Sequence, residues 1–310
     1  MQAPELGLAG AAAGFLAAAV RVATPLALAA TGESVAERAG VINVGLEGIM
    51  LGGALGAAWG AAASLSPWLG LVVGMLAGSA VAAVFALVAI RLRGDQIVVG
   101  TAITLGALGL TGALYRAAFG TGGAGLSLPT LAPLRVPLLS AIPVIGPALF
   151  DQPAPTYLLY ALSALAWIVL TRTHAGLAIR AAGESPSAAA AAGGNVRSLR
   201  TAVTLLNGLT GGLAGATLVL AQTGTFAERM TAGRGFIAIA IVVLGRWHPF
   251  GVLAAALLFG AASALQYAVQ AVGLAVPYQF VLMTPYLVTL LALAGVGGRA
   301  RAPEALGKAA

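Results

Sequence analysis

The sequence predicts an all-α protein, a polytopic bundle of about nine membrane-spanning helices (eight to ten) forming one transmembrane domain over residues 1–310. Composition gives the first reason, since the chain is 60% hydrophobic and 8% charged, whereas soluble proteins have about 25% charged residues. The second reason is that apolar runs recur along the whole chain, most of them long enough to cross about 30 Å of hydrocarbon. The longest charged stretch, 172–200, has fewer than thirty residues, which leaves no room for a soluble catalytic domain.

Nine apolar segments are expected to form the spans. The first has no preceding Lys or Arg, which favours a membrane span over a signal peptide. The seventh has only twelve residues, so we expect either a short span extended by its flanks or a re-entrant element. The nine segments are 6–31, 40–62, 67–90, 97–118, 155–171, 201–223, 235–246, 249–272 and 276–297.

The basic residues predict an orientation for this bundle. With the N-terminus outside and the C-terminus in the cytoplasm, eleven of the sixteen Lys and Arg residues lie on the cytoplasmic side. One more, Arg21, lies within a span, and the bias agrees with the positive-inside rule. Because the arginines are scattered between apolar runs, the net charge of +7 does not indicate nucleic-acid binding. The four outer residues are Arg116, Arg135, Arg229 and Arg234.

Several kinds of chemistry are not expected from this sequence. The absence of cysteine excludes disulfides and thiol catalysis. The two histidines flank spans, and the sequence contains no HExxH motif. We therefore predict no catalytic residues, no metal site and no cofactor.

The segment 119–154 differs from the rest because prolines are concentrated there, and dense proline breaks long helices. We expect an outer loop with short helical pieces. It could be a gate, a docking surface or a plain connector.

The segment 172–200 is the one sizeable cytoplasmic loop. Residues 184–187 resemble a helix start, alanines follow, and Gly193 and Gly194 end the run, which predicts a short surface helix.

Polar residues within the apolar runs are the candidates for a translocation path. A carboxylate inside a span costs about 2.5–3.5 kcal/mol, so Glu47 should face protein or water. Asn43 lies four residues earlier, on the same helix face. Asn207 and Gln222 add polar groups from the sixth segment. A purely structural carboxylate, bonded to a neighbouring helix, is the alternative. Glycines spaced four apart, as at Gly52, Gly56 and Gly60, indicate close helix packing.

Three blocks carry a family resemblance: ERAGVINVGLEGIMLGGA at 37–54, GLAIRAAGESPSAAAAAGGNV at 176–196 and MTAGRGFIAIAIVVLGRWHPFG at 230–251. With them the chain resembles permease subunits of bacterial ABC importers for branched-chain amino acids, ribose-type sugars and nucleosides. The first and third blocks look most like the nucleoside and simple-sugar branch. The resemblance covers nearly the whole chain.

The resemblance implies a multi-pass protein of the bacterial plasma (inner) membrane, surrounded by lipid. It also implies three protein partners: a separate ABC ATPase, a second and non-identical permease, and an extracytoplasmic substrate-binding lipoprotein. Because the chain has no Walker motif, ATP hydrolysis is expected in the ATPase subunit. Residues 183–196 would be the coupling helix that docks on that ATPase.

The resemblance also selects candidate residues. Asn43 and Glu47 match the family's first block, and Ser185 and Gly194 stand where the family often has Asn and Ile. The residues expected at the ATPase joint are Arg180, Gly183, Glu184, Ser185 and Pro186, and those of the third block are Gly233, Arg234 and Gly235.

A self-contained secondary transporter or channel remains the alternative function. Such a protein needs its own coupling-ion site, usually built among broken helices, and Glu47, Asn207 and Gln222 could supply one. The substrate stays open between a nucleoside, a sugar and an amino acid.

Overall fold

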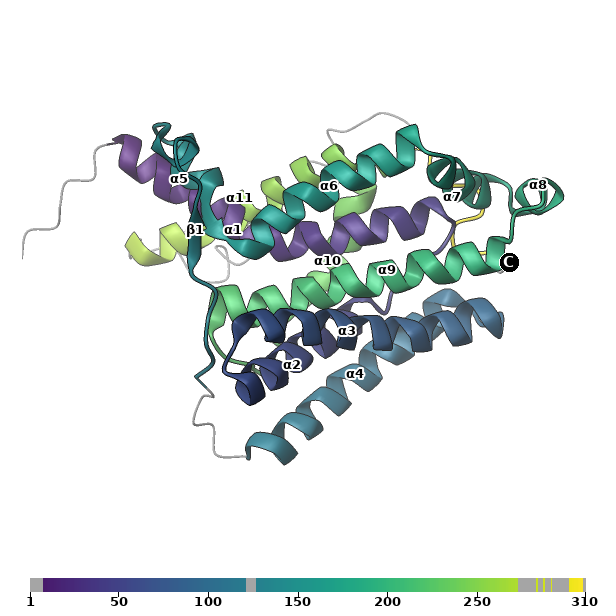
Figure 1. The fold of residues 1–310 in the computed structure, drawn as a ribbon, viewed down its shortest axis with the longest axis horizontal. Helices are drawn as coiled ribbons and strands as arrows, with labels where there is room; N and C mark the ends of the chain where they lie inside the picture. Colours follow the sequence, from purple (N-terminus) through teal and green to yellow (C-terminus); the bar gives the residue numbers. More distant parts are fainter. Residues whose placement is uncertain are drawn as a thin grey trace, which may run out of the picture.

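The computed structural model describes residues 8–120, 127–272 and 301–308, together with the single positions 283, 287 and 291. Over these residues the chain is a bundle of long helices (Figure 1). Seven of the described helices are long and apolar enough to cross a membrane. The prediction of a polytopic helical membrane protein is confirmed, and the ninth predicted segment, 276–297, lies outside the described residues except for the single positions 283, 287 and 291.

The described elements are α1 (Leu8–Arg38), α2 (Leu46–Ser64), α3 (Pro67–Phe85) with its π-helical continuation η1 (Ala86–Arg91), α4 (Gln96–Phe119), β1 (Pro133–Arg135), η2 (Leu139–Ala141), α5 (Ile145–Phe150), β2 (Asp151–Pro153), α6 (Ala154–Arg172), α7 (His174–Glu184), α8 (Pro186–Ala191), α9 (Val196–Thr217) with its continuation η3 (Leu218–Thr223), α10 (Arg234–Leu244) and α11 (Pro249–Val272).

The bundle has two distinct ends, visible in Figure 1. At one, which we call the hairpin end, β1, β2 and α5 lie beside the start of α1. At the other, the α7–α8 end, these two short helices project beyond the long ones. The segment 301–308 also lies at the α7–α8 end, because the Ala305 N–H donates to the carbonyl of Gly183. The first and last described residues are therefore at opposite ends.

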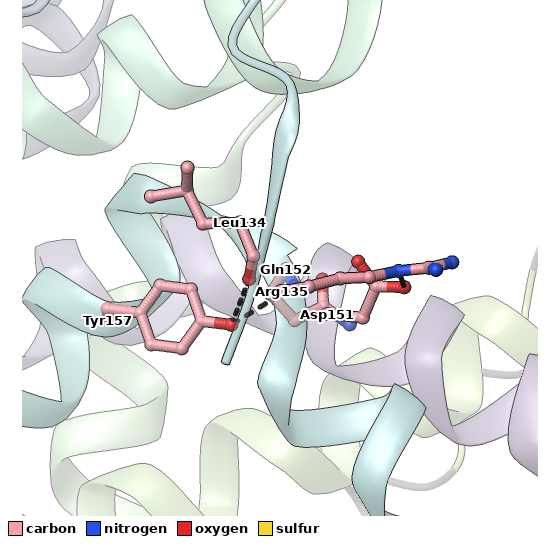
Figure 2. Close-up of polar contacts among 5 residues, drawn as sticks. All are labelled: Leu134, Arg135, Asp151, Gln152 and Tyr157. Carbon is pink, nitrogen blue, oxygen red and sulfur yellow. Dashed lines mark hydrogen bonds and ion pairs between the residues drawn. The ribbon is translucent and has the colours of Figure 1, made fainter. Parts of the chain in front are cut away.

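The segment 119–154 contains the predicted short helical pieces, η2 and α5, and in addition a small hairpin. β1 pairs with β2 antiparallel, with Leu134 opposite Gln152. Figure 2 shows how the hairpin is fixed: Arg135 Nε donates to Asp151 at 2.8 Å, and the Tyr157 hydroxyl donates to the Leu134 carbonyl at 2.6 Å. Tyr157 belongs to α6, so the hairpin is tied to the bundle.

The first connection differs from the predicted one. α1 continues through Glu33 and Glu37 to Arg38, beyond the predicted end of the first span at residue 31. The helix continues because both carboxylates are buried and hydrogen-bonded. The turn follows at 39–45, where Gly40 has φ +85°. Asn43 lies in this turn and not in α2, so the expectation that it shares a helical face with Glu47 is wrong.

The short helix α10 completes a crossing of the bundle in two parts. After η3 the chain is at the hairpin end, where Leu128 N–H donates to the Gly224 carbonyl. Residues 224–233 are irregular, and α10 then runs for 11 residues, about 16 Å, to the α7–α8 end. The predicted short segment is thus extended by its preceding flank. Arg234 starts α10 inside this crossing, not in an outer loop as the orientation count assumed.

Three helices, α2, α3 and α9, pack with their backbones in contact. A Cβ added at Gly53 would lie 2.5 Å from the Gly212 Cα, and one at Gly74 would lie 2.8 Å from the Gly53 carbonyl oxygen. Real Cβ contacts are never this short, so only glycine fits these crossings. The glycine spacing therefore serves close helix packing, as the sequence predicted.

Candidate functional site

Glu47 joins the start of α2 to the start of α10. Its side chain is buried, at 4% exposure. Oε1 accepts hydrogen bonds from the Thr231 hydroxyl at 2.6 Å and the Gly233 N–H at 2.8 Å, and Oε2 accepts from the Gly235 N–H at 2.6 Å. The first N–H groups of a helix have no partner within the helix, and that end carries partial positive charge. Glu47 therefore caps α10 from another helix.

The two glycines beside Arg234 make this cap possible. Gly233 has φ +83°, in the left-handed region, and forms the turn into α10. Gly235 lies against α2, since a Cβ there would be 2.5 Å from the Glu47 Cα and 2.9 Å from its Oε2. The first and third sequence blocks are therefore neighbours in space, joined at Glu47 and Gly235.

Arg234 folds back over the turn that precedes α10. Its Nη1 donates to the carbonyl of Met230 at 2.8 Å and to that of Thr231 at 3.4 Å. The side chain is half-buried. Among the described residues, the ion pairs are those of Arg116 with Glu228 and Arg135 with Asp151, so Arg234 uses carbonyl groups instead of a carboxylate.

A second polar network centres on Glu33, a residue that sequence reasoning missed. Its Oε1 accepts from the backbone N–H of Asn43 at 2.8 Å, and its Oε2 accepts from the Asn207 side chain. All three residues are fully buried. Asn43 Oδ1 also accepts from the Gly45 N–H at 3.1 Å, which stabilises the turn before α2. The network ties α1, the α1–α2 turn and α9 together.

Part of this network has unused hydrogen-bonding capacity. Among the described residues, buried polar atoms without a partner include Asn43 Nδ2, Asn207 Oδ1 and Thr31 Oγ1. Such atoms cost free energy unless another conformation or a water satisfies them.

One helical turn further along α1, Glu37 accepts from the Trp247 indole N–H, and Arg38 Nε donates to the Trp247 carbonyl at 3.1 Å. α1 is thus joined to the α10–α11 turn.

Gln222 does not lie with the other candidates. It is in η3, and its Nε2 donates to the Arg21 carbonyl of α1 at 2.8 Å. It follows Asn207 by fifteen residues in the sequence, which is about 22 Å along a helix. Asn43 and Asn207 meet through Glu33, and Glu47 belongs to the separate cap of α10. In this conformation the three buried candidates bond to protein groups.

The α7–α8 segment presents the predicted short helix and a second one that was not predicted. Ser185 is the N-cap of α8, accepting from the Ala188 N–H at 3.4 Å, with Pro186 at the first helical position. α7 precedes it. Its signal was the spacing of Gly176, Ile179, Ala182 and Gly183, which all lie on the buried face.

The exposed and buried residues of this segment separate clearly. Arg180 and Glu184 are exposed. Gly183 is buried directly against the Arg38 carbonyl, where a Cβ would not fit. A hollow of about 610 Å³ lies between α7, α8 and the start of α9, and His174, Leu177 and Leu199 are among its lining residues. Within the described residues, no three His, Cys, Asp or Glu side chains come close enough to hold a metal ion.

Comparison with known proteins extends over this whole arrangement. Residues 15–293 match the protein family described as the permease component of branched-chain amino acid transport systems. The chain is 39% identical to the guanosine ABC transporter permease protein NupQ of Bacillus subtilis and 38% identical to the nucleoside ABC transporter permease protein NupC of Lactococcus lactis, each over 92% of both chains. It is also 39% identical to a putative glucose ABC transporter permease protein of Haloferax volcanii, over 85% of this chain and 80% of that one.

Proposed function

Because the chain belongs to the family of permease components of branched-chain amino acid transport systems, we propose that it forms half of the pathway by which an ATP-driven importer takes up a nucleoside or a simple sugar. As a permease subunit of an ABC importer it is a multi-pass membrane protein that works with an ATPase and a substrate-binding protein. Two similar proteins are named for guanosine and nucleoside transport, which puts nucleosides first among the substrates.

The observation that carries the coupling role is the α7–α8 segment. It projects from one end of the bundle (Figure 1), with Arg180 and Glu184 exposed and Gly183 anchored against α1. An exposed element on a rigid base is suited to receive force from a separate ATPase. We therefore place the α7–α8 end, and with it residues 301–308, in the cytoplasm. The hairpin end then faces the substrate-binding lipoprotein.

The buried polar candidates brace the pathway in this proposal. Glu47 holds the start of α10, and Asn43 and Asn207 hold α1 against α2 and α9 through Glu33. α10 begins inside the bundle, beside the start of α2. Half-helices of this kind often surround transport sites, so we place the substrate near the start of α10 and the adjoining irregular segment.

Assembly follows from the single α7–α8 segment in each chain. An ABC ATPase pair presents two docking grooves, so this chain needs a second permease, which we propose to be non-identical. The glycine face of α2 is occupied inside the chain by α3, and that of α3 by α2 and α9. The contact with the second permease therefore uses other, lipid-exposed faces.

Reconstitution tests the proposed function. We would co-express the chain with the ATPase, the second permease and the lipoprotein. Native mass spectrometry of the detergent-solubilised complex then gives its mass and subunit composition. In proteoliposomes, labelled guanosine should enter when ATP is supplied. Unlabelled glucose and leucine serve as competitors for its uptake. An ATPase subunit with its Walker lysine replaced is the matched control and should give no uptake. Uptake by this chain alone, driven by an ion gradient, would show that it is a secondary transporter.

A further inference from the structure

Arg200 of α9 is a buried cation whose guanidinium hydrogen-bonds only to backbone carbonyls among the described residues. It is 1% exposed. Nε donates to the Ala39 carbonyl at 2.9 Å, Nη2 to the Ala182 carbonyl at 3.3 Å, and Nη1 to the Lys308 carbonyl at 2.8 Å. The three acceptors come from three distant parts of the chain, so one side chain connects them.

Two of these acceptors belong to helix C-termini. Ala39 directly follows α1, and Ala182 lies in the last turn of α7. Carbonyls in these positions have no partner within their helix and carry partial negative charge. A guanidinium has five N–H donors in a fixed plane and keeps its charge. Arg200 can therefore satisfy the ends of α1 and α7 at the same time, which a shorter or single-donor side chain cannot do.

Residues 303–308, which we call the tail segment, close the same junction from the other side. The Ala305 N–H donates to the Gly183 carbonyl at the end of α7, at 2.9 Å. The Gly307 N–H donates to the Gly40 carbonyl in the α1–α2 turn, at 3.2 Å. Lys308 contributes its carbonyl to Arg200. Pro303 and Ala305 are buried, so the tail segment is packed into the bundle.

The junction also reaches the start of α4. Gln96 Nε2 donates to the Lys308 carbonyl at 3.4 Å, and Gln96 Oε1 accepts from the Ile42 N–H at 2.8 Å. The approach of Arg200 to the α1–α2 turn leaves no space for a side chain at Gly40, where a Cβ would be 2.5 Å from Nη2. The contacts thus link α1, α4, α7 and α9 at one end of the bundle.

We propose that Arg200 and the tail segment form a clamp that makes α7 move as one body with α1. Movement imposed on the α7–α8 segment then reaches Glu33 and Glu37 on α1, and through them α9 and the α10–α11 turn. In this inference, which rests on the proposed function, Arg200 is a positioning residue for coupling ATP hydrolysis to transport.

The test compares coupling with assembly in the reconstituted complex. Arg200→Met removes the donors while keeping an unbranched side chain in place of the aliphatic part of Arg200, and Arg200→Lys keeps the charge with a single ammonium. Arg197→Met, at an exposed position of the same helix, is the matched control. The measurements are copurification of the ATPase and the number of labelled guanosine molecules taken up per ATP hydrolysed.

The expected results separate a clamp from a local structural role. Arg200→Met should still copurify with the ATPase, while its uptake per ATP falls on the order of tenfold, within the usual range of coupling effects. Arg200→Lys should fall less, and Arg197→Met should match the wild type. Assembled Arg200 variants with an unchanged ratio would overturn the clamp.

A second perturbation keeps the inference testable if the Arg200 variants do not insert. Ala305→Pro removes the N–H that donates to Gly183, and a chain that stops at Arg301 removes the whole tail segment. Both should lower uptake per ATP with Arg200 intact, and an unchanged ratio in both would refute the clamp. A wild-type complex without ATP-dependent uptake would instead count against the proposed function.

Discussion

The cap of α10 by Glu47 predicts that hydrogen bonding at this position matters more than charge. Glu47→Gln keeps the shape of the side chain. Its amide oxygen can still accept from Thr231 and from the Gly233 N–H, which places the NH₂ group against the Gly235 N–H. The variant therefore loses one charge-assisted bond, worth about 1.5–3 kcal/mol. We expect a modest loss of stability and most of the transport activity.

Glu47→Leu should be far more damaging. It leaves the Thr231 hydroxyl and the N–H groups of Gly233 and Gly235 without acceptors in a buried place. At about 1–3 kcal/mol for each unsatisfied donor, the cost is roughly 3–9 kcal/mol. This is comparable with the whole stability of a typical protein, about 5–15 kcal/mol. The start of α10 should therefore detach from α2, and uptake should be lost.

The assay compares labelled guanosine uptake with the amount of folded protein in the membrane. Thermal stability in detergent, followed by size-exclusion chromatography, gives the structural readout. Glu228→Gln is the matched control, because Glu228 is a partly exposed carboxylate paired with Arg116. Equal loss of uptake in the Gln and Leu variants, with both stably folded, would refute the reasoning, since charge would then be essential. Full uptake by both would exclude any role for the cap.

Three further predictions concern packing, the buried network and the ATPase joint. Gly212→Leu should abolish folded protein, because the α9 backbone touches α2 and α3 there. Gly106→Leu should be tolerated, because the space beside Gly106 is open. Size-exclusion chromatography in detergent measures the monodispersity of both variants. Asn207→Leu removes one of the two donors to Glu33 and should lower the free energy of unfolding by about 1–3 kcal/mol. A double-mutant cycle with Glu33→Gln measures the coupling between the two side chains. Additive losses of stability in the double variant would contradict the contact. Glu184→Arg should impair ATPase copurification without affecting membrane insertion, and normal copurification with normal uptake would remove Glu184 from the joint.

The spans could be predicted from sequence because twenty apolar residues have few alternatives to a membrane helix. The end of the first span, predicted at residue 31, could not, since the helix includes the charged residues Glu33 and Glu37 and ends at Arg38. Their partners, Asn207 and Trp247, are 174 and 210 residues away in the sequence. A single sequence shows the cost of burying a carboxylate but not the distant donor that offsets it. For the same reason, the sequence did not reveal the contacts of Arg200 with distant carbonyl groups.

The site was predictable in part for similar reasons. Glu47 and the Gly233–Gly235 motif were selected separately, from two sequence blocks, and their contact appears only in the fold. The hairpin of β1 and β2 was missed because dense proline suggests irregular chain, while proline at a strand edge is compatible with a short ladder.

The glycine crossings of α2, α3 and α9 divide the molecule into a static and a mobile part. Where backbones touch, there are no side-chain rotamers to rearrange, so these three helices have no neighbouring packing to slide into. A transport cycle needs an alternative arrangement somewhere in the bundle. We expect it at α1, which contacts α9 through the side chains of Asn207 and Thr210, and at α11, which packs on α1. The trio would then be the fixed frame against which the two faces of the membrane are opened in turn.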